Sequence, residues 1–214
     1  MNKIEQIYKR LEKSITFEPV INKLARKKAA PFQILIATMV SARTKDEVTE
    51  KAAGRLFSVY KTARDLINGD IKKIEKLIYP VGFYKTKAKN IIEISRKLLA
   101  EFKGSVPRTI TELTTLPGVG LKTAALVMAE GFGIDEICVD THVHRISNRL
   151  GFVKTKTPEQ TYTALKKKLP KKLWRRTNFY MVSYGKTVCK PIGPRCDICT
   201  LNELCPKIGV KNKE

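Results

Sequence analysis

Four cysteines near the carboxyl end of the chain form the clearest pattern for metal chemistry. They follow the spacing C-x6-C-x2-C-x5-C and are Cys189, Cys196, Cys199 and Cys205. Two disulfides, a structural zinc ion or an iron–sulfur cluster would each use four cysteines. Structural zinc sites usually pair their ligands across two to four residues, and only Cys196 and Cys199 are that close. The longer arms favour an iron–sulfur cluster, whose four thiolates surround a larger body.

A lysine beside a glycine-rich turn is the second candidate chemical group. In LPGVGLKTA, residues 116–124, Gly118 and Gly120 precede Lys122 at the start of an apolar-striped helix. Glycines lack Cβ and the first N–H groups of a helix point outward, so such a turn can hold a phosphate. The alternatives are an ordinary turn between helices and a solvated lysine. Beside a phosphodiester, the helix dipole and nearby cations would favour the neutral amine of Lys122, which could attack a sugar carbon.

A carboxylate follows in VDTHVHR, residues 139–145. Asp140 is placed to cap the helix THVHRISNRL, which is expected to end at Gly151. The same carboxylate could stabilise the positive charge that develops at C1′ when a glycosidic bond breaks. His142 and His144 are two residues apart and diverge on a helix, so we expect structural or phosphate-contacting roles rather than a metal pair.

The charge of the chain indicates a polyanionic partner. Its 214 residues include 42 Lys and Arg against 20 Asp and Glu, a formal net charge of +22. The surplus is spread over the whole length, which fits a nucleic acid; a merely basic, soluble surface is the alternative.

The first residues, MNKIEQIYKRLEK, lack the apolar stretch of a secretory signal, so we expect no such signal here, and no apolar run is long enough to span a membrane. The 5 cysteines are an odd number in such a chain, which disfavours a secreted disulfide framework and favours a reducing compartment. Cys138, in the apolar stretch EICVD, is expected to be a buried apolar residue rather than a ligand.

Helical periodicity dominates the elements that must position these groups. In KAKNIIEISRKLLAEFKG one apolar stripe ends at Gly104, with Pro107 just beyond, as at the end of a helix. Thr157, Pro158 and Gln160 predict an N-cap, a first-turn proline and a capping-box partner for another helix. No sustained period-two alternation is present, so the sequence predicts an all-α fold. Regular patterning stops near residue 186, where the cysteine segment begins.

Three motifs together resemble one family. LPGVGLKTA resembles the helix-hairpin-helix of the endonuclease III family of DNA glycosylases, VDTH resembles its catalytic aspartate segment, and the cysteine spacing resembles its iron–sulfur loop. They occur in the family's order, and the resemblance extends over essentially the whole chain. It implies two helical domains flanking a DNA-binding cleft. Residues 25–134 would form a helical barrel with the helix-hairpin-helix at about 110–130, and residues 1–24 and 135–214 a discontinuous iron–sulfur cluster domain.

The resemblance also implies an activity. The protein would be a bifunctional DNA glycosylase and apurinic/apyrimidinic lyase of base excision repair, which excises oxidised pyrimidines from double-stranded DNA. Lys122 would displace the damaged base, form a Schiff base with the opened sugar and lead to β-elimination 3′ of the lesion, with Asp140 assisting. The four cysteines would bind a structural [4Fe-4S] cluster. The protein would be a monomer that acts on DNA carrying a damaged base or an abasic site. It would lie in a prokaryotic cytoplasm, associated with the nucleoid, and would have no membrane partner.

Several residues are DNA-contact candidates by the same resemblance. A flipped base leaves a gap that side chains must fill. VGFYKTKAKN resembles the segment that inserts an apolar wedge, here Phe83, and MVSARTKDE resembles the segment that fills the orphan space. The family's usual glutamine is replaced there by Arg43, which puts the opposing-base preference in doubt. The other candidates are Asp46 near the cleft, the hairpin residues Gly118, Val119 and Gly120, the loop residues Lys190 and Arg195, and His142.

Two other functions are compatible with parts of this pattern. A mismatch-specific adenine or thymine glycosylase would share the hairpin and the cysteine loop, but such relatives typically lack the lysine at position 122. A non-catalytic DNA-binding module would need neither Lys122 nor Asp140. Abundant lysine with few glutamines also fits a heat-loving source.

Overall fold

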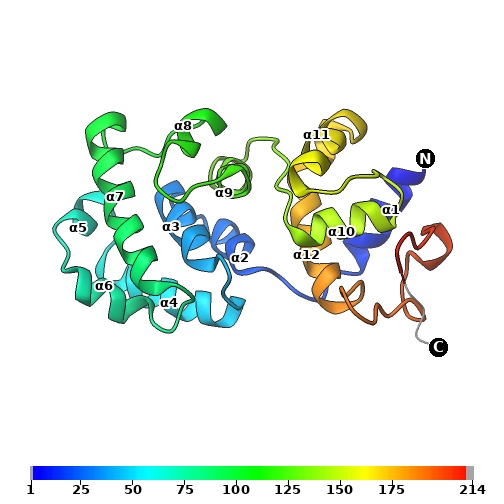
Figure 1. Cartoon of the computed structure of the whole chain (residues 1–214), viewed down its shortest axis with the longest axis horizontal. Helices are drawn as coiled ribbons and strands as arrows, with labels where there is room; N and C mark the ends of the chain where they lie inside the picture. Colours follow the sequence, from blue (N-terminus) through cyan, green and yellow to red (C-terminus); the bar gives the residue numbers. More distant parts are fainter. Residues whose placement is uncertain (1, 211–214) are drawn as a thin grey trace. The chain divides into compact units, whose positions relative to one another are not determined.

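The computed structural model describes residues 2–210, and the regular elements of this part of the chain are all helices, with no β-strand (Figure 1). The all-α prediction is therefore confirmed. Contacts within the chain define two compact units. Unit 1 is drawn from Met1–Pro19 and Asp135–Glu214, and unit 2 is Val20–Ile134. The expected boundary at residue 25 falls inside helix α2, Val20–Arg26, which belongs to unit 2.

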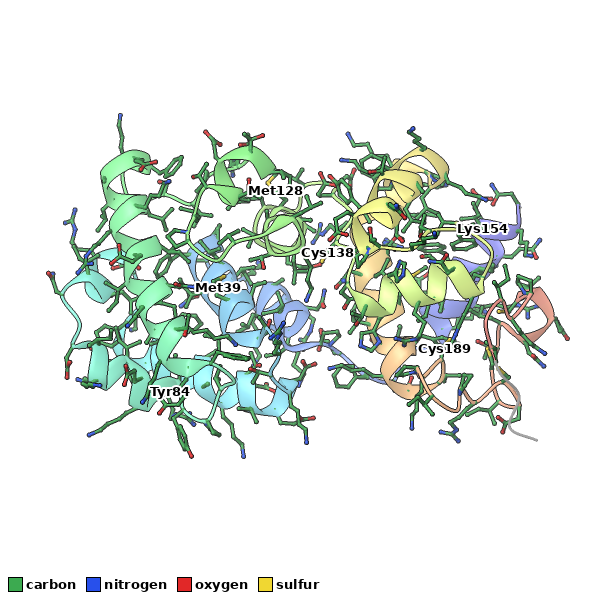
Figure 2. The ribbon with its side chains drawn as sticks, viewed as in Figure 1. Met39, Tyr84, Met128, Cys138, Lys154 and Cys189 are labelled. Atoms are coloured by element: carbon green, nitrogen blue, oxygen red, sulfur yellow. The ribbon has the colours of Figure 1, made fainter. Side chains whose placement is uncertain are left out.

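Unit 2 is built around one helix that is apolar on nearly all sides. This helix, α3 (Pro31–Ser41), is buried at every position from Phe32 to Val40 except Gln33. It contributes to a core that includes Met39 and Met128, both labelled in Figure 2. The longest helix of this unit, α7 (Tyr84–Phe102), packs against α3, against α5 (Ala63–Ile67) and against α6 (Ile71–Ile78). The helices of this unit are α2 Val20–Arg26, α3 Pro31–Ser41, α4 Asp46–Val59, α5 Ala63–Ile67, α6 Ile71–Ile78, α7 Tyr84–Phe102, α8 Ile110–Thr114 and α9 Leu121–Leu126.

The predicted end of α7 is confirmed. The helix stops at Phe102, and Lys103 and Gly104 follow with left-handed φ values of +53° and +80°. The N–H of Gly104 donates to the carbonyl of Leu98 at 2.8 Å. Glycine takes this conformation at no steric cost, which is why it is so often found just beyond a helix.

The helix after the glycine-rich turn is less regular than its sequence predicts. α9 ends at Leu126, and Val127–Gly131 continues as a π-helical turn. This turn packs against α3, and a Cβ on Gly131 would lie 3.5 Å from Cα of Pro31. A local pattern cannot encode such a π-turn, because it accommodates packing between distant segments.

Unit 1 joins the first helix of the chain to the last ones. Its helices are α1 Lys3–Lys13, α10 Thr141–Arg149, α11 Pro158–Lys168 and α12 Trp174–Thr187, with short 3-10 turns at Lys171–Leu173 and Asn202–Leu204. A second core holds them together, and within it Oη of Tyr8 lies 2.7 Å from Oγ1 of Thr177.

The start of α11 confirms part of the predicted capping pattern. Thr157 accepts a hydrogen bond from the N–H of Gln160, as an N-cap does. The side chain of Gln160, however, accepts from the N–H of Lys156 rather than from that of Thr157. The cap is present, but the reciprocal bond reaches one residue further back. None of the helices in the described part of the chain is long and apolar enough to cross a membrane.

Candidate active site and cysteine loop

The glycine-rich turn joins α8 to α9 within unit 2. Gly118 has a φ of +73°, and a Cβ on it would lie 2.6 Å from Nδ2 of Asn90 and 2.9 Å from Cε of Met39. Any other residue here would have a strained backbone and crowded neighbours. Gly120 is the N-cap of α9, and a Cβ on it would have no neighbour within 4 Å. The turn is thus fixed on its inner side and open at Gly120, where a phosphate could approach the backbone.

Val119 has a more limited role than the sequence predicts. Its side chain is only 5% exposed and packs in the core of unit 2. Its N–H donates to the carbonyl of Leu116 at 3.1 Å. Since both groups are used by the fold, a DNA contact by Val119 is restricted to its carbonyl group.

Lys122 is the second residue of α9, and its side chain is exposed. Ala124 and Ala125, one half-turn further on, are buried. The helix therefore directs its apolar side toward the core of unit 2 and Lys122 away from it, as the apolar stripe in the sequence predicts.

Asp140 caps α10 in unit 1, as predicted. Its Oδ1 accepts hydrogen bonds from the N–H groups of His142 and Val143, each at 2.9 Å. The carboxylate is only partly exposed. The two capping bonds fix its position to the backbone of α10, so its location does not depend on a flexible side chain.

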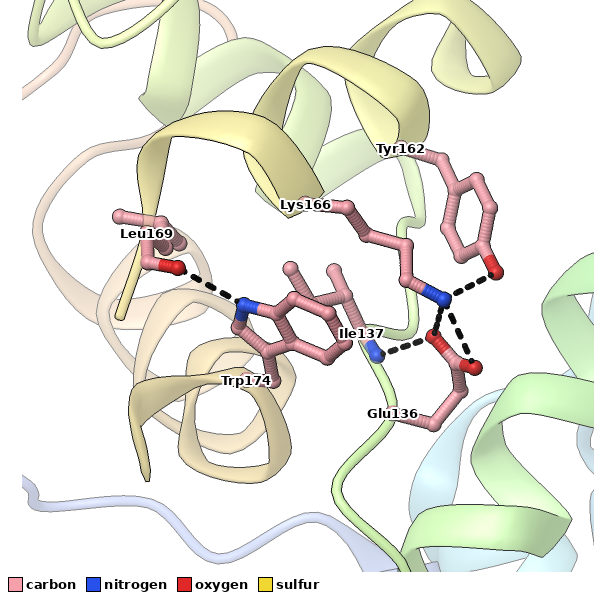
Figure 3. A network of polar contacts seen from close by, with 6 residues as sticks. All are labelled: Glu136, Ile137, Tyr162, Lys166, Leu169 and Trp174. Atoms are coloured by element: carbon pink, nitrogen blue, oxygen red, sulfur yellow. Dashed lines mark hydrogen bonds and ion pairs between the residues drawn. The ribbon is translucent and has the colours of Figure 1, made fainter. Parts of the chain in front are cut away.

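The segment that leads to Asp140 is held by a polar network, drawn in Figure 3. Glu136 is 8% exposed; its carboxylate accepts from Nζ of Lys166 at 3.1 Å and from the N–H of Ile137 at 2.9 Å. Nζ of Lys166 also bonds Oη of Tyr162 at 3.1 Å and lies 4.9 Å from the centroid of the Trp174 ring. Desolvation alone would lower the pKa of Lys166, but its bonds to Tyr162 and Glu136 outweigh this and raise the pKa.

A second contact restrains the same segment. Nδ2 of Asn178 donates to the carbonyl of Cys138 at 3.2 Å. The side chain of Cys138 is 1% exposed, which agrees with its prediction as a buried apolar residue. Residues 136–140 are therefore positioned by α11 and α12 before α10 begins.

The two residues predicted to enter the DNA base stack lie against each other in unit 2. The guanidinium carbon of Arg43 is 5.5 Å from the centroid of the Phe83 ring, a cation–π contact. Phe83 is 63% exposed, and Arg43 is exposed as well. Asp46 is the first residue of α4, three positions after Arg43. The sequence predicted these residues separately, and the structure brings Arg43 and Phe83 into direct contact.

The four cysteines of the C-terminal motif line one pocket in unit 1, after the end of α12. None of them forms a disulfide. Burial raises the pKa of the Cys196 and Cys205 thiols. In residues 2–210, no three His, Cys, Asp or Glu side chains are arranged to hold a single metal ion.

Two hydrogen-bond donors to these sulfurs were not identified from the sequence. Nη1 of Arg149 donates to Sγ of Cys189 at 3.4 Å and to the carbonyl of Lys190 at 2.6 Å. Oη of Tyr184 donates to Sγ of Cys199 at 3.2 Å. No local signal marks either residue, because Arg149 reaches the loop from α10 and Tyr184 from α12.

The remaining candidates divide into exposed and packed residues. Lys190 and Arg195 have exposed side chains, while their backbones are fixed by Arg149 and by a 3.0 Å bond from the N–H of Arg195 to the carbonyl of Val188. Nδ1 of His142 lies 3.2 Å from Nη2 of Arg145. Nδ1 of His144 lies 2.6 Å from Oγ1 of Thr161, which is a structural contact.

Comparison with known proteins defines the class of the molecule. Residues 36–171 match the family model for the HhH-GPD superfamily base excision DNA repair protein. Among solved structures, a trapped endonuclease III–DNA covalent intermediate with an estranged adenine is similar, with a TM-score of 0.80, 35% identity, and coverage of 97% of each chain.

Sequence relatives narrow this class. Endonuclease III of Thermotoga maritima is 50% identical over 179 residues, which cover 84% of each chain. The chloroplastic endonuclease III homolog 2 of Arabidopsis thaliana is 44% identical over 184 residues, 82% of this chain but only 48% of that protein. The chain belongs to the endonuclease III family. Its reaction class is that of a base excision repair DNA glycosylase and abasic-site lyase that acts on damaged bases.

Proposed function

We propose that Lys122 is the nucleophile of this reaction and that oxidised pyrimidines in double-stranded DNA are its substrates. Nζ of Lys122 attacks C1′ of the damaged nucleotide, and the bond from C1′ to the base breaks. The C1′–O4′ bond then breaks, O4′ takes a proton, and a Schiff base joins C1′ to Nζ. Loss of a proton from C2′ allows β-elimination, which breaks the C3′–O bond and releases the 3′ phosphate as the leaving group. The observation that carries this proposal is the hairpin, where Gly120 leaves the backbone open two residues before the exposed Lys122.

Asp140 assists in this proposal through its charge. Both capping bonds end on Oδ1, and we assign Oδ2 to the sugar, where it stabilises the positive charge that develops at C1′ as the base leaves. Arg43 and Phe83 fill the space that the flipped base vacates, and Gly118, Gly120, Lys190 and Arg195 contact phosphates. Because an arginine stands where the family usually has glutamine, the opposing-base preference is set by Arg43.

The four cysteines are proposed to hold a [4Fe-4S] cluster. The donor set consists of thiols only, the four line one pocket, and their spacing in the sequence suits a polynuclear body better than a single zinc ion. Bound there, the group would join the loop of residues 189–205 into a rigid unit that presents Lys190 and Arg195. Unit 2 is proposed to be the helical barrel domain and unit 1 the cluster domain. We propose that the protein works as a monomer on the chromosomal DNA of a prokaryote.

Borohydride trapping tests the nucleophile. The protein is incubated with duplexes that carry thymine glycol or an abasic site, beside Lys122→Ala, Asp140→Asn and Lys73→Ala. Lys73 is an exposed lysine of the same unit, so its variant removes an equal charge. We expect an adduct for the wild type and Lys73→Ala on both duplexes and none for Lys122→Ala. An adduct that persists in Lys122→Ala would assign the Schiff base to another amine.

A further inference from the structure

Lys87 is a buried lysine that the proposed chemistry does not use. It lies in the first turn of α7 and is 7% exposed. Its Nζ donates to the carbonyls of Val40 at 2.8 Å and Ala42 at 2.5 Å, and lies 3.4 Å from Oγ1 of Thr44. These three partners are uncharged: two are backbone carbonyl oxygens and one is a hydroxyl oxygen. Burial lowers the pKa of Lys87 to about 8, because desolvation disfavours its charged form.

The ammonium group of Lys87 lies at the C-terminal end of α3. Carbonyl groups in the last turn of a helix lack partners within the helix and carry partial negative charge, so a cation is favourable there. α3 has no basic residue in its own last turn. Lys87 supplies the missing cation from a different helix and thereby links the end of α3 to the start of α7.

A tight turn with an unusual residue follows α3 directly. The N–H of Thr44 donates to the carbonyl of Ser41 at 3.0 Å, and Ala42 has φ −57° and ψ 124°. These values match the second residue of a type II turn, whose third residue needs a positive φ and is usually glycine. Arg43 occupies that third position with a φ of +52°. The turn therefore directs a long cationic side chain outward from a position that favours glycine.

The turn before α7 also has a non-glycine residue with a positive φ at its third position. A bond of 3.1 Å closes residues 81–84, and the third residue, Phe83, has a φ of +59°. The two turns touch, because the N–H of Gly82 donates to Oγ1 of Thr44 at 3.3 Å and a Cβ on Gly82 would lie 2.9 Å from the carbonyl oxygen of Arg43. Nζ of Lys87 donates to the carbonyl of Ala42 in the first turn. Lys87 itself belongs to α7, the helix that follows the second turn.

We propose that Lys87 is a positioning residue that joins the turn bearing Arg43 to the turn bearing Phe83, so that the two side chains enter the DNA base stack as a preformed pair. The inference rests on the insertion roles assigned under the proposed function. The physical basis is preorganisation. Both side chains must be in place when the damaged base leaves the stack, and ordering them beforehand removes the entropy cost of fixing them from the flipping step.

A fluorescent duplex measures this insertion without any chemistry. A tetrahydrofuran abasic analogue is placed opposite 2-aminopurine, whose emission rises when side chains displace it from the stack. Lys87→Met keeps the chain length but removes the donors and the charge. Lys89→Met is the matched control, since it removes the same charge from an exposed position on the same helix. At saturating protein we expect the rise in emission to fall about 5-fold or more for Lys87→Met and to stay within about 2-fold for Lys89→Met.

Thr44→Val is a second variant that leaves the buried lysine in place. It removes the oxygen shared by Lys87 and the N–H of Gly82, so a smaller loss in the same direction is expected. Hydrogen exchange at the amide of Gly82 gives a readout that needs no DNA, and exchange should quicken in both variants. This readout separates the two proposals, because it responds to the link between the turns even if borohydride trapping shows that Lys122 is not the nucleophile.

Single-turnover rates distinguish positioning from general damage to the fold. We expect Lys87→Met to slow base release from a paired lesion about 10-fold or more, while cleavage of single-stranded abasic DNA, which has no partner strand to displace, changes by about 2-fold or less. Equal losses on both substrates would overturn the proposal, as would identical 2-aminopurine signals for Lys87→Met and Lys89→Met.

Discussion

The two glycines of the hairpin should respond in opposite ways to the same added methyl group. Gly118→Ala introduces a Cβ at a φ of +73°, 2.6 Å from Nδ2 of Asn90 and 2.9 Å from Cε of Met39. Both neighbours are the ends of flexible side chains and can move aside, so the main cost is the left-handed backbone, about 1–2 kcal/mol. We expect a fall in Tm of roughly 2–8 °C.

Gly120→Ala should leave the fold almost unchanged. Its φ is −93°, and the new Cβ has no neighbour within 4 Å. The stiffer unfolded chain favours alanine while the N-cap position favours glycine, so the two effects nearly cancel, to within about 0.5 kcal/mol. The methyl group would, however, lie where the backbone is proposed to receive a phosphate. Loss of one or two charge-assisted bonds there predicts DNA binding weaker by about 10-fold or more.

Thermal unfolding and fluorescence anisotropy with an abasic-analogue duplex measure both quantities on the same samples. Gly118→Ala should lower the stability but, below its melting range, change the DNA affinity little, because its Cβ points toward Asn90 and Met39 and the phosphate contact is made by the backbone. Gly120→Ala should show the reverse, a loss of affinity at nearly unchanged stability. If Gly120→Ala binds DNA as tightly as the wild type, the open face of the turn is not the phosphate site and the role assigned to the hairpin is wrong.

Three further predictions concern other parts of the site. Asp140→Ala removes both capping bonds and should cost about 1 kcal/mol of stability, whereas Asp140→Asn keeps an acceptor oxygen and should not; base release should fall about 100-fold or more in both. The pKa of Lys87 is lowered from 10.5 to about 8, so between pH 8 and pH 10.5 the unfolded chain binds more protons than the folded protein. The free energy of unfolding of the wild type, relative to that of Lys87→Met, should therefore rise with pH across this window by at most about 1.4 kcal/mol per pH unit, as measured by urea titrations. Tyr184→Phe removes the donor to Cys199 and should shift the reduction potential of a bound cluster to more negative values, measured by protein-film voltammetry, since a hydrogen bond to a thiolate stabilises the reduced state.

Features that depend on neighbouring residues could be predicted from the sequence. The caps at Thr157 and Asp140 follow from side chains that bond nearby backbone N–H groups. The end of α7 follows from Gly104, which takes a left-handed backbone conformation without steric cost. The burial of Cys138 followed from its apolar neighbours. Such signals place the candidate groups on the correct elements.

Features that depend on contacts between distant segments could not be predicted from the sequence. In the sequence Lys87 is one more lysine in KTKAKN, and only the approach of α3 to α7 reveals its three acceptors. The left-handed backbones of Arg43 and Phe83 were equally hidden, because neither residue type signals a positive φ. The burial of Val119 went unrecognised for the same reason: its neighbours suggest an open loop, whereas the core of unit 2 covers its side chain.

The division of unit 1 between the two ends of the chain has a consequence for synthesis on the ribosome. Unit 2 is continuous, Val20–Ile134, so its core can form as soon as this stretch has emerged. α1 cannot complete its packing until Thr177, the partner of Tyr8 across 169 residues, has been made. At ordinary translation speeds this delay is roughly 10–30 s. The nascent chain therefore carries the unpacked amphipathic segment of α1 ahead of an already folded unit, and nascent-chain chaperones have that interval in which to bind Ile7, Tyr8 and Leu11 before the core of unit 1 covers them.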